Sequence, residues 1–411
     1  MSRSNCRFCG RTLEHVFADL GTSPLANSYL TAERLADVEP TYPLEVMVCD
    51  SCFLVQLPEL ASPAELFTDY AYFSSYSDTW LRHAERYAEA MVARLGLGTD
   101  HRVVEIASND GYLLQYFQRH GIPVLGVEPA ANVAAAAEAA GIPTLVEFFG
   151  TESAGRLAAA GRHADLLVGN NVLAHVPDIN DFVAGLELAL APGGVVTMEF
   201  PHLLRLMEEN QFDTIYHEHF SYLSFTTTRR IFAHHALTLF DVDELPTHGG
   251  SLRIYGRRLA DEAGAVTPSV AELLEREAVA GLGTLEPYQR FGERVRETRG
   301  LLLEFLAEAK RNGKTIAAYG AAAKGNTLLN YCGIGAETLD YVVDRSPHKQ
   351  GCFLPGTRLP IHPPERLFET RPDLVFILPW NIKEEVLEQM AGVKEWGGEF
   401  FVAIPEVEVC G

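Results

Sequence analysis

The sequence predicts an α/β protein in which a doubly wound parallel sheet follows a small cysteine-rich module and precedes a second α/β unit. Two C-x2-C pairs near the N-terminus mark the module, which has few large apolar residues for a core. Apolar runs of strand length then alternate with helical stretches, as is typical of a parallel sheet covered by helices. A second alternation begins at Lys314. We therefore expect three domains, over residues 1–63, 64–300 and 301–411.

The composition is that of a folded, acidic protein. Of the 411 residues, 47% are hydrophobic and 21% are charged, which is ordinary for a globular chain of several domains. The net charge of −22 argues against nucleic acid as a partner, because a phosphate backbone requires a basic surface. No apolar run reaches membrane-spanning length. Cys6 and Cys9 stand where a signal peptide would have its apolar core, so we expect a cytoplasmic protein without a membrane partner.

The two cysteine pairs predict a structural metal site. Each C-x2-C pair can place two thiolates on one ion, and two pairs complete the tetrahedral four-sulfur site that zinc prefers. Such a closed site has no open position, so we assign it no catalysis. A redox role is the weaker reading, because neither pair follows a strand and opens a helix. The expected Zn²⁺ ligands are Cys6, Cys9, Cys49 and Cys52.

Five apolar runs with helices between them form the expected central sheet. They lie within residues 102–117, 124–129, 144–149, 165–176 and 193–201. Residues 237–245 and 251–259 can extend this sheet as an antiparallel pair. Ligands of doubly wound sheets bind at the carboxyl ends of the strands, near the point where the strand order reverses. The turns after these five runs should therefore carry the binding residues.

The turns resemble those of the class I S-adenosylmethionine-dependent methyltransferases. The first strand enters a Glu-x-x-x-Asn-Asp-Gly turn, the second ends in an acid, and Pro192-Gly193-Gly194 precedes the fifth. A dinucleotide-binding domain is the alternative, but the Asn-Asp turn and the Ala191-Pro192-Gly193-Gly194 turn favour the methyltransferase. Ala107 stands where the family usually has glycine. The resemblance implies that S-adenosylmethionine is bound by Glu105, Ala107, Asn109, Gly111, Tyr112, Glu128, Pro129, Phe148, Phe149, Asn170 and Asn171.

The segment Phe212–Ser224, FDTIYHEHFSYLS, is the densest collection of acid–base groups in the chain. Imidazole titrates near neutral pH, and neighbouring phenols and carboxylates can tune it. A polar surface loop is the alternative reading. In a straight strand Tyr216 and Glu218 would face away from His219, so their convergence requires an irregular turn, which we predict here. A histidine metal site is weakly supported, because metalloprotease motifs have the spacing H-E-x-x-H.

The C-terminal unit begins like a Rossmann-like domain, with a strand, a small-residue turn and a helix start over residues 314–326. Ala322 replaces the middle glycine of a dinucleotide fingerprint, and its methyl group argues against bound NAD. Lys324 and Asn326 at the helix start could instead bind a phosphate. A duplicated scaffold domain without a ligand is the alternative.

The whole order of features resembles the nucleotide-sugar C-methyltransferases. These enzymes act on 4-keto-deoxyhexoses in the bacterial biosynthesis of branched sugars, several of which are antibiotic components. The features are the four-cysteine module, the methyltransferase core, the Tyr216–Phe220 segment, THGGSLR at 247–253 and the C-terminal unit. The resemblance implies that a nucleotide sugar, with dTDP as the expected nucleotide, lies between the middle and C-terminal domains. It implies a reacting-sugar site of Tyr216, Glu218, His219 and His175, and further substrate contacts from Tyr72, Tyr76, His248, Arg253, Lys324, Asn326, Trp380 and Asn381.

The expected chemistry is C-methylation through an enolate, at C3 of a 4-keto-6-deoxy sugar. A base must take a proton beside the ketone while a donor stabilises the developing oxygen charge. We expect His219 to be the base, Tyr216 the donor or alternative base, and Glu218 the group that orients the imidazole. His217 remains a possible base. O- or N-methylation of another metabolite, an NAD-dependent oxidoreductase and a non-enzymatic scaffold also remain open.

Overall fold

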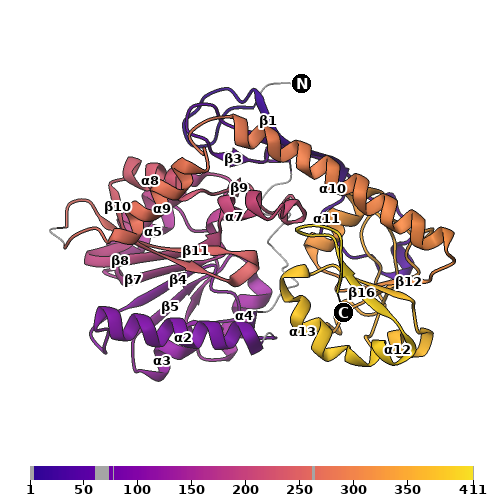
Figure 1. The fold of residues 1–411 in the computed structure, drawn as a ribbon. Coiled ribbons are helices and arrows are strands. Elements are labelled where there is room, and N and C mark those ends of the chain that lie inside the picture. The colour runs from indigo at the N-terminus through magenta and orange to yellow at the C-terminus, as the bar shows by residue number, and fades with distance from the viewer. Residues whose placement is uncertain (1–3, 61–73, 77, 262–263, 411) are drawn as a thin grey trace.

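A computed structural model describes residues 4–60, 74–76, 78–261 and 264–410. The central and C-terminal α/β domains lie side by side, and the N-terminal module and helix α10 (Glu286–Arg311) run across one end of both (Figure 1). None of the helices within these ranges is long and apolar enough to cross a membrane.

The central domain contains a seven-stranded sheet of order β10-β11-β8-β7-β4-β5-β6. The five strands from β8 to β6 pair in parallel, and β11 pairs antiparallel with both β8 and β10. This confirms the doubly wound sheet with an added antiparallel pair. The strands are β4 (Val103–Ile106), β5 (Val124–Val127), β6 (Thr144–Leu145), β7 (Ala164–Asn170), β8 (Leu190–Pro201), β10 (Leu237–Leu245) and β11 (Ser251–Arg258).

Helices cover both faces of the central sheet (Figure 1). One sequence-based expectation is wrong here: the third strand stops at Leu145 and does not continue to Phe149, because the chain leaves the sheet edge and Phe148 is half exposed. The helices are α2 (Asp78–Leu95), α3 (Leu114–Arg119), α4 (Ala131–Ala139), α5 (Thr151–Ala159), α6 (Ile179–Ala189), α7 (Leu203–Glu208), α8 (Phe225–His234) and α9 (Pro268–Val279).

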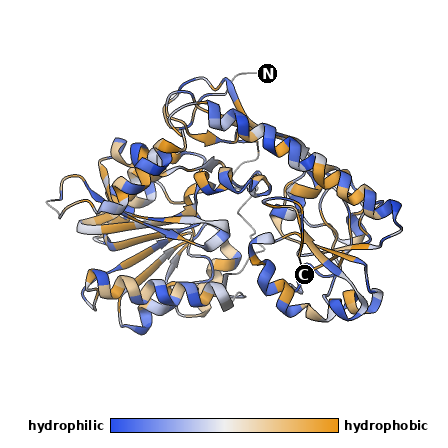
Figure 2. Ribbon diagram, viewed as in Figure 1, coloured by the Kyte–Doolittle hydropathy of each residue, from blue (hydrophilic) through white to orange (hydrophobic). Residues whose placement is uncertain are grey.

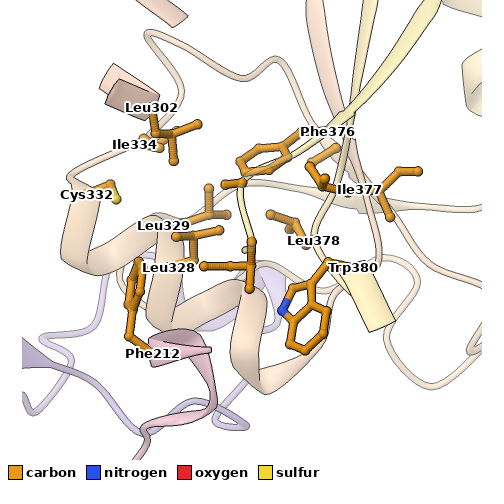
Figure 3. Packing of buried hydrophobic residues seen from close by; sticks show 14 of the residues in the cluster. Phe212, Leu302, Leu328, Leu329, Cys332, Ile334, Phe376, Ile377, Leu378 and Trp380 are labelled. Atoms are coloured by element: carbon orange, nitrogen blue, oxygen red, sulfur yellow. The ribbon is translucent and has the colours of Figure 1, made fainter. Parts of the chain in front are cut away.

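The C-terminal domain contains a six-stranded sheet of order β14-β13-β12-β15-β16-β17, parallel except for β17. Phe212 of the segment Phe212–Ser224 packs into the core of this domain, beside α11 (Figure 3). The elements are β12 (Ile316–Tyr319), α11 (Ala323–Cys332), β13 (Val342–Val343), β14 (Ile361–His362), α12 (Arg366–Thr370), β15 (Leu374–Ile377), α13 (Lys383–Gln389), β16 (Glu399–Val402) and β17 (Glu408–Cys410).

The sheet of the N-terminal module includes a strand from the central domain. Its order is β1-β2-β3-β9, formed by β1 (His15–Ser23), β2 (Tyr42–Val48), β3 (Val55–Gln56) and β9 (Ser221–Tyr222). Strand β9 belongs to the segment Phe212–Ser224 and pairs antiparallel with β3. The cysteine module is therefore built directly onto that polar segment.

Helix α10 joins the three parts of the chain. Its buried side chains recur every three, four or seven residues, at Tyr288, Phe291, Val295, Leu302 and Leu306, so one apolar stripe faces inward while polar residues cover the rest (Figure 2). The ring of Phe291 stacks on Phe17 of β1, with centroids 4.5 Å apart. The helix runs through residue 300 without a break, so the boundary expected there falls inside a continuous element.

Candidate functional site

The four cysteines of the N-terminal module lie in one cluster. Their sulfur atoms are all within 4.8 Å of one another, and the Cys6–Cys52 and Cys9–Cys49 Sγ pairs are 3.5 Å apart. Ligand sulfurs about 2.3 Å from a tetrahedral zinc lie about 3.8 Å from one another, so the cluster fits this ion. Each pair is held by a tight turn: the amide of Gly10 donates to Cys6 O, and that of Phe53 to Cys49 O. The cluster therefore has the geometry of a structural site, in which four sulfur ligands leave no open position on the ion.

The carboxyl ends of β4 and β7 form a polar edge of the central sheet. Within the described part of the chain, no hydrogen-bond partner is present for Glu105 Oε2, Asp110 Oδ1 or either side-chain polar atom of Asn170, although all are buried. Burial raises the pKa of Glu105 well above its ordinary value, and the nearby acids Glu128 and Asp110 raise it further. Buried polar groups without partners are costly, so this edge is suited to a polar ligand such as S-adenosylmethionine.

The turn after β4 is organised by Glu128 at the end of β5. One oxygen of the Glu128 carboxylate accepts the amide of Asn109 at 2.9 Å, and the other accepts the amide of Ala130 at 2.8 Å. Ala107, Asn109 and Gly111 all have positive φ, at 54°, 50° and 79°. Ala107 therefore adopts a left-handed conformation that costs free energy for a residue with a Cβ atom and that glycine adopts without this cost.

Replacing Ala107 with glycine should therefore stabilise the central domain by about 0.5–1 kcal/mol. Glycine relieves the strain of the left-handed conformation, and the greater backbone freedom of glycine in the unfolded chain offsets part of that gain. Urea unfolding of wild type and Ala107→Gly measures this difference. The matched control, Ala135→Gly, removes a methyl from an exposed position inside α4 and should destabilise by about 1 kcal/mol. Equal destabilisation by both changes would contradict the strain at Ala107.

The segment Phe212–Ser224 adopts the irregular turn that its sequence predicts. A 3-10 helix at Phe212–Thr214 is followed by a turn in which the amide of His219 donates to Tyr216 O at 2.9 Å. Two main-chain bonds at Phe220 then fix its position. The Phe220 amide donates to Ala174 O at 2.8 Å, and Leu57 of the N-terminal module donates to Phe220 O at 3.0 Å. The turn is thus fixed between the end of β7 and the cysteine module.

His219 lies buried in a cluster of aromatic rings. Its ring centroid is 4.0 Å from that of Tyr216 and 4.7 Å from that of His175, which follows β7. Nδ1 lies 2.9 Å from Thr214 O, and because a carbonyl only accepts, Nδ1 carries the proton and Nε2 keeps its lone pair. Burial, and then the neighbouring His175, lower the pKa of His219 well below its ordinary value, so the ring is neutral near pH 7.

Thr214, and not Glu218, orients the His219 imidazole, which corrects the role expected for Glu218. Both carboxylate oxygens of Glu218 instead accept from Asn27 Nδ2, at 2.8 and 3.0 Å. Burial raises the pKa of Glu218 to about 7, although the Asn27 bond acts in the opposite direction. The Glu218 carboxylate therefore faces the N-terminal module, whereas the next side chain, His219, lies in the aromatic cluster.

His217 is directed to the other side of the turn. Its Nε2 lies 3.2 Å from Pro43 O, and its ring packs edge-on against Tyr42 of β2 at 5.8 Å. Burial lowers the pKa of His217. Of the two histidines in the segment, only His219 contacts His175.

Several expected substrate residues gather where the central and C-terminal domains meet. His248 Nε2 is 3.0 Å from Asn171 Nδ2, which links the 247–253 loop to the end of β7. Lys324 Nζ donates to Asn381 Oδ1 at 2.7 Å and lies 4.7 Å from the centroid of the Trp380 ring. The Trp380 indole donates to Asp213 Oδ2 at 2.8 Å, so the segment Phe212–Ser224 also reaches this group. Tyr76 stacks on His348, with centroids 5.9 Å apart. Tyr72 lies outside the described residues.

Three expected site residues have other partners. The guanidinium of Arg253 binds Glu199 at 2.6 and 2.7 Å, so its charge is neutralised within the central domain. The side-chain amide of Asn326 is buried and donates to Ala26 O at 2.6 Å, which ties α11 to the N-terminal module. Phe149 packs edge-on against Phe182 of α6. Their sequence positions gave no indication of these contacts, because each partner is distant in the chain.

Glu199 is a buried acid whose charge has two partners, Arg253 and His83, the latter at 2.8 Å. Burial alone would raise the pKa of Glu199, but these two groups outweigh it and lower the pKa below the ordinary 4.5. Ionised Glu199 therefore contributes its full stabilising free energy at pH values above its ordinary pKa. This contribution is lost as pH falls through the lower pKa that Glu199 has in the folded protein.

Glu199→Gln should lower the free energy of unfolding of the central domain by about 3–5 kcal/mol at pH 7, because it leaves a buried cation without its partner. Denaturant unfolding measures this loss. The exposed pair Arg205–Glu208 supplies the control, and Glu208→Gln should change stability by less than about 1 kcal/mol. Similar effects of both variants would contradict the buried ion pair.

Sequence reasoning missed Asn27, Thr214 and Glu199. Asn27 lies in the 24–30 loop of the N-terminal module and contacts an acid far along the chain. Thr214 acts through its main-chain carbonyl, which any residue type would supply. Only Glu199 had a recognisable feature, since an acid at the end of an otherwise apolar strand requires a partner.

Comparisons with known proteins agree with the order of the three domains along the chain. Three family models cover the chain in order: a zinc binding domain over residues 6–67, a methyltransferase domain over 80–241 and a C-methyltransferase C-terminal domain over 246–405. The C-methyltransferase NovU of Streptomyces niveus is 36% identical over 404 residues, which span 98% of this chain and 96% of NovU.

The solved structures similar to the chain include methyltransferases. The magnesium protoporphyrin IX methyltransferase of Synechocystis is 13% identical, with 43% of this chain and 83% of that chain covered and a TM-score of 0.35. An S-adenosylmethionine-dependent methyltransferase of Clostridium acetobutylicum is 11% identical, with 43% and 92% covered and a TM-score of 0.36. Because NovU matches nearly the full length of both chains, this protein belongs to the C-methyltransferase family, as an S-adenosylmethionine-dependent enzyme with an N-terminal zinc-binding domain.

Proposed function

We propose that the protein methylates a nucleotide-linked 4-keto-6-deoxy sugar at C3, the carbon beside the ketone. The observation that supports this most directly is the state of His219. It is a buried, neutral imidazole whose Nδ1–H donates a hydrogen bond to Thr214 O. Its Nε2 is therefore the nitrogen that can accept a proton. A neutral imidazole can take a proton from oxygen or nitrogen as well as from carbon, and the similarity to C-methyltransferases favours transfer to carbon.

The residues around His219 have distinct roles in the proposed reaction. His219 Nε2 takes the proton from the carbon beside the ketone, and the electron pair of that C–H bond moves toward the ketone oxygen. Tyr216, whose ring lies against His219, donates a hydrogen bond to the oxygen as charge develops there. Glu218 accepts a hydrogen bond from a sugar hydroxyl, and His175 packs against the base from the end of β7. Bound S-adenosylmethionine supplies an electrophilic methyl group on a sulfonium sulfur.

The polar edge at the ends of β4, β5 and β7 would hold the cofactor. Glu128 and the partnerless atoms of Glu105, Asp110 and Asn170 offer hydrogen bonds to hydroxyl and ammonium groups. His175 follows the same strand as Asn170 and contacts His219. The base is therefore adjacent to the cofactor edge, as methyl transfer between two positioned reactants requires.

The nucleotide would lie between the central and C-terminal domains. The N-terminus of α11 presents main-chain amides, and Lys324 adds a positive charge beside Trp380 and Asn381. This combination suits a diphosphate, with dTDP as the nucleotide that the family resemblance suggests. His248, held near Asn171, and Tyr76 add polar and aromatic groups along the same boundary.

Methyl transfer with S-adenosylmethionine labelled with ¹³C in its methyl group tests the proposal. With a dTDP-4-keto-6-deoxy sugar, we expect a new methyl group bonded to carbon in the NMR spectrum of the product. The corresponding 4-hydroxy sugar is the control, because it has no acidic C–H and should not react. A methyl group on oxygen or nitrogen, or release of S-adenosylhomocysteine without a new C–C bond, would contradict C-methylation.

A further inference from the structure

A loop of the N-terminal module reaches the reacting-sugar site. Asn27, in the loop of residues 24–30, donates its side-chain amide to both carboxylate oxygens of Glu218, at 2.8 and 3.0 Å. Glu218 is buried, whereas Asn27 is exposed. The residue that holds this carboxylate therefore comes from a different domain.

The C-terminal domain fixes this loop on both sides of Asn27. Asn326 Nδ2 at the start of α11 donates to Ala26 O at 2.6 Å, and Tyr29 Oη donates to Ala321 O at 2.6 Å. Lys349 donates to the same Ala321 oxygen at 2.8 Å. Because Ala26 is bound by α11 and Tyr29 by the turn before it, Asn27 has little freedom to move away from Glu218.

Within the described part of the chain no cation forms an ion pair with Glu218, so its carboxylate depends on the amide of Asn27. The ion pairs among the described residues include none with Glu218, and its side-chain oxygens receive hydrogen bonds from Asn27. The titratable groups close to it are Tyr29 from the loop and His175, which hydrogen-bonds to the main chain of Glu218. His219 follows it in the turn. A neutral donor that bridges both oxygens fixes the plane of the carboxylate while leaving its remaining lone pairs for a ligand.

We propose that Asn27 is a positioning residue for methyl transfer: its amide fixes the Glu218 carboxylate against the sugar, so that the N-terminal module completes the active site. This inference rests on the proposed C-methylation. It assigns the module a second task besides metal binding. It also links the carboxylate to the turn before α11, where the nucleotide would bind.

The test compares three variants in the ¹³C-methyl transfer assay. Asn27→Ala should lower kcat by about tenfold or more, because a hydrogen bond to a charged group is lost. Its pH profile should also change: with the donor gone, the ionised carboxylate is less favoured, and the acid limb of kcat moves to higher pH. Asn27→Asp, which has nearly the same shape, replaces the donor with an acceptor and should move that limb further.

Ser28→Ala is the matched control. Its hydroxyl donates only within the loop, to Leu25 O at 2.8 Å, so kcat should stay within about twofold and the pH profile unchanged. If wild type methylates carbon while the Asn27 variants behave like Ser28→Ala, the inference about Asn27 is overturned and the proposed function stands. If wild type itself forms no carbon–methyl bond, the proposed function and the inference that rests on it both fail.

Discussion

Replacing His219 with asparagine is expected to lower kcat for C-methylation by about 10²–10⁴-fold, the usual contribution of a positioned general base. Asparagine can still donate to Thr214 O, but it offers no basic nitrogen where Nε2 stood. The variant should fold and bind S-adenosylmethionine normally, because the cofactor edge at β4 and β7 is untouched. Steady-state kinetics, thermal unfolding and cofactor titration measure the three quantities.

His217→Asn is the matched control for this prediction. It changes a histidine two residues away that faces Pro43 and the N-terminal module. Its kcat should fall by less than about tenfold, since no proton transfer is lost. Near-normal turnover of His219→Asn, or an equal loss in both variants, would remove His219 as the base.

Replacing Cys6 with serine should abolish metal binding and most of the activity together. Structural zinc sites contribute about 10–16 kcal/mol of binding free energy in small domains, so a lost thiolate ligand unfolds the module. Strand β3 would then no longer pair with β9, and Leu57 would no longer hold Phe220 beside His219. We expect substoichiometric zinc by elemental analysis and at least a hundredfold loss of kcat.

Hydrogen exchange gives a second readout that does not depend on turnover. The amides of Ser221 and Tyr222 in β9 should lose protection in Cys6→Ser. Cys352→Ser is the control, because Cys352 is half-buried in the C-terminal domain, outside the cluster. It should retain zinc, exchange protection and activity. Full activity of a metal-free Cys6→Ser protein would refute a structural link between the metal module and the site.

The features that could be predicted from the sequence are those with a local pattern. The C-x2-C spacing places pairs of sulfurs on one ion, and the cluster of four follows. Alternating apolar runs and helices predict the parallel sheet, because each run is too apolar to lie anywhere but between two layers. The turn at His217–Glu218 followed from the two-residue period of a strand, which cannot direct Tyr216, Glu218 and His219 to one place.

The contacts that could not be predicted join segments distant in the chain. Nothing in the 24–30 loop indicates that Asn27 meets Glu218, and β9 is only two residues long. Arg253 looks like an anion-binding residue until the tertiary structure places it beside Glu199. Such pairs depend on how the domains pack, and packing has no periodic pattern in the sequence.

The most direct test of the central claim is solvent deuterium exchange at the carbon beside the ketone, with S-adenosylhomocysteine in place of the methyl donor. The wild-type protein should incorporate deuterium into the nucleotide-linked keto sugar, and His219→Asn should do so at least a hundredfold more slowly. His217→Asn should exchange at close to the wild-type rate. Absence of exchange in the wild type, or equal exchange in His219→Asn, would contradict proton removal by His219.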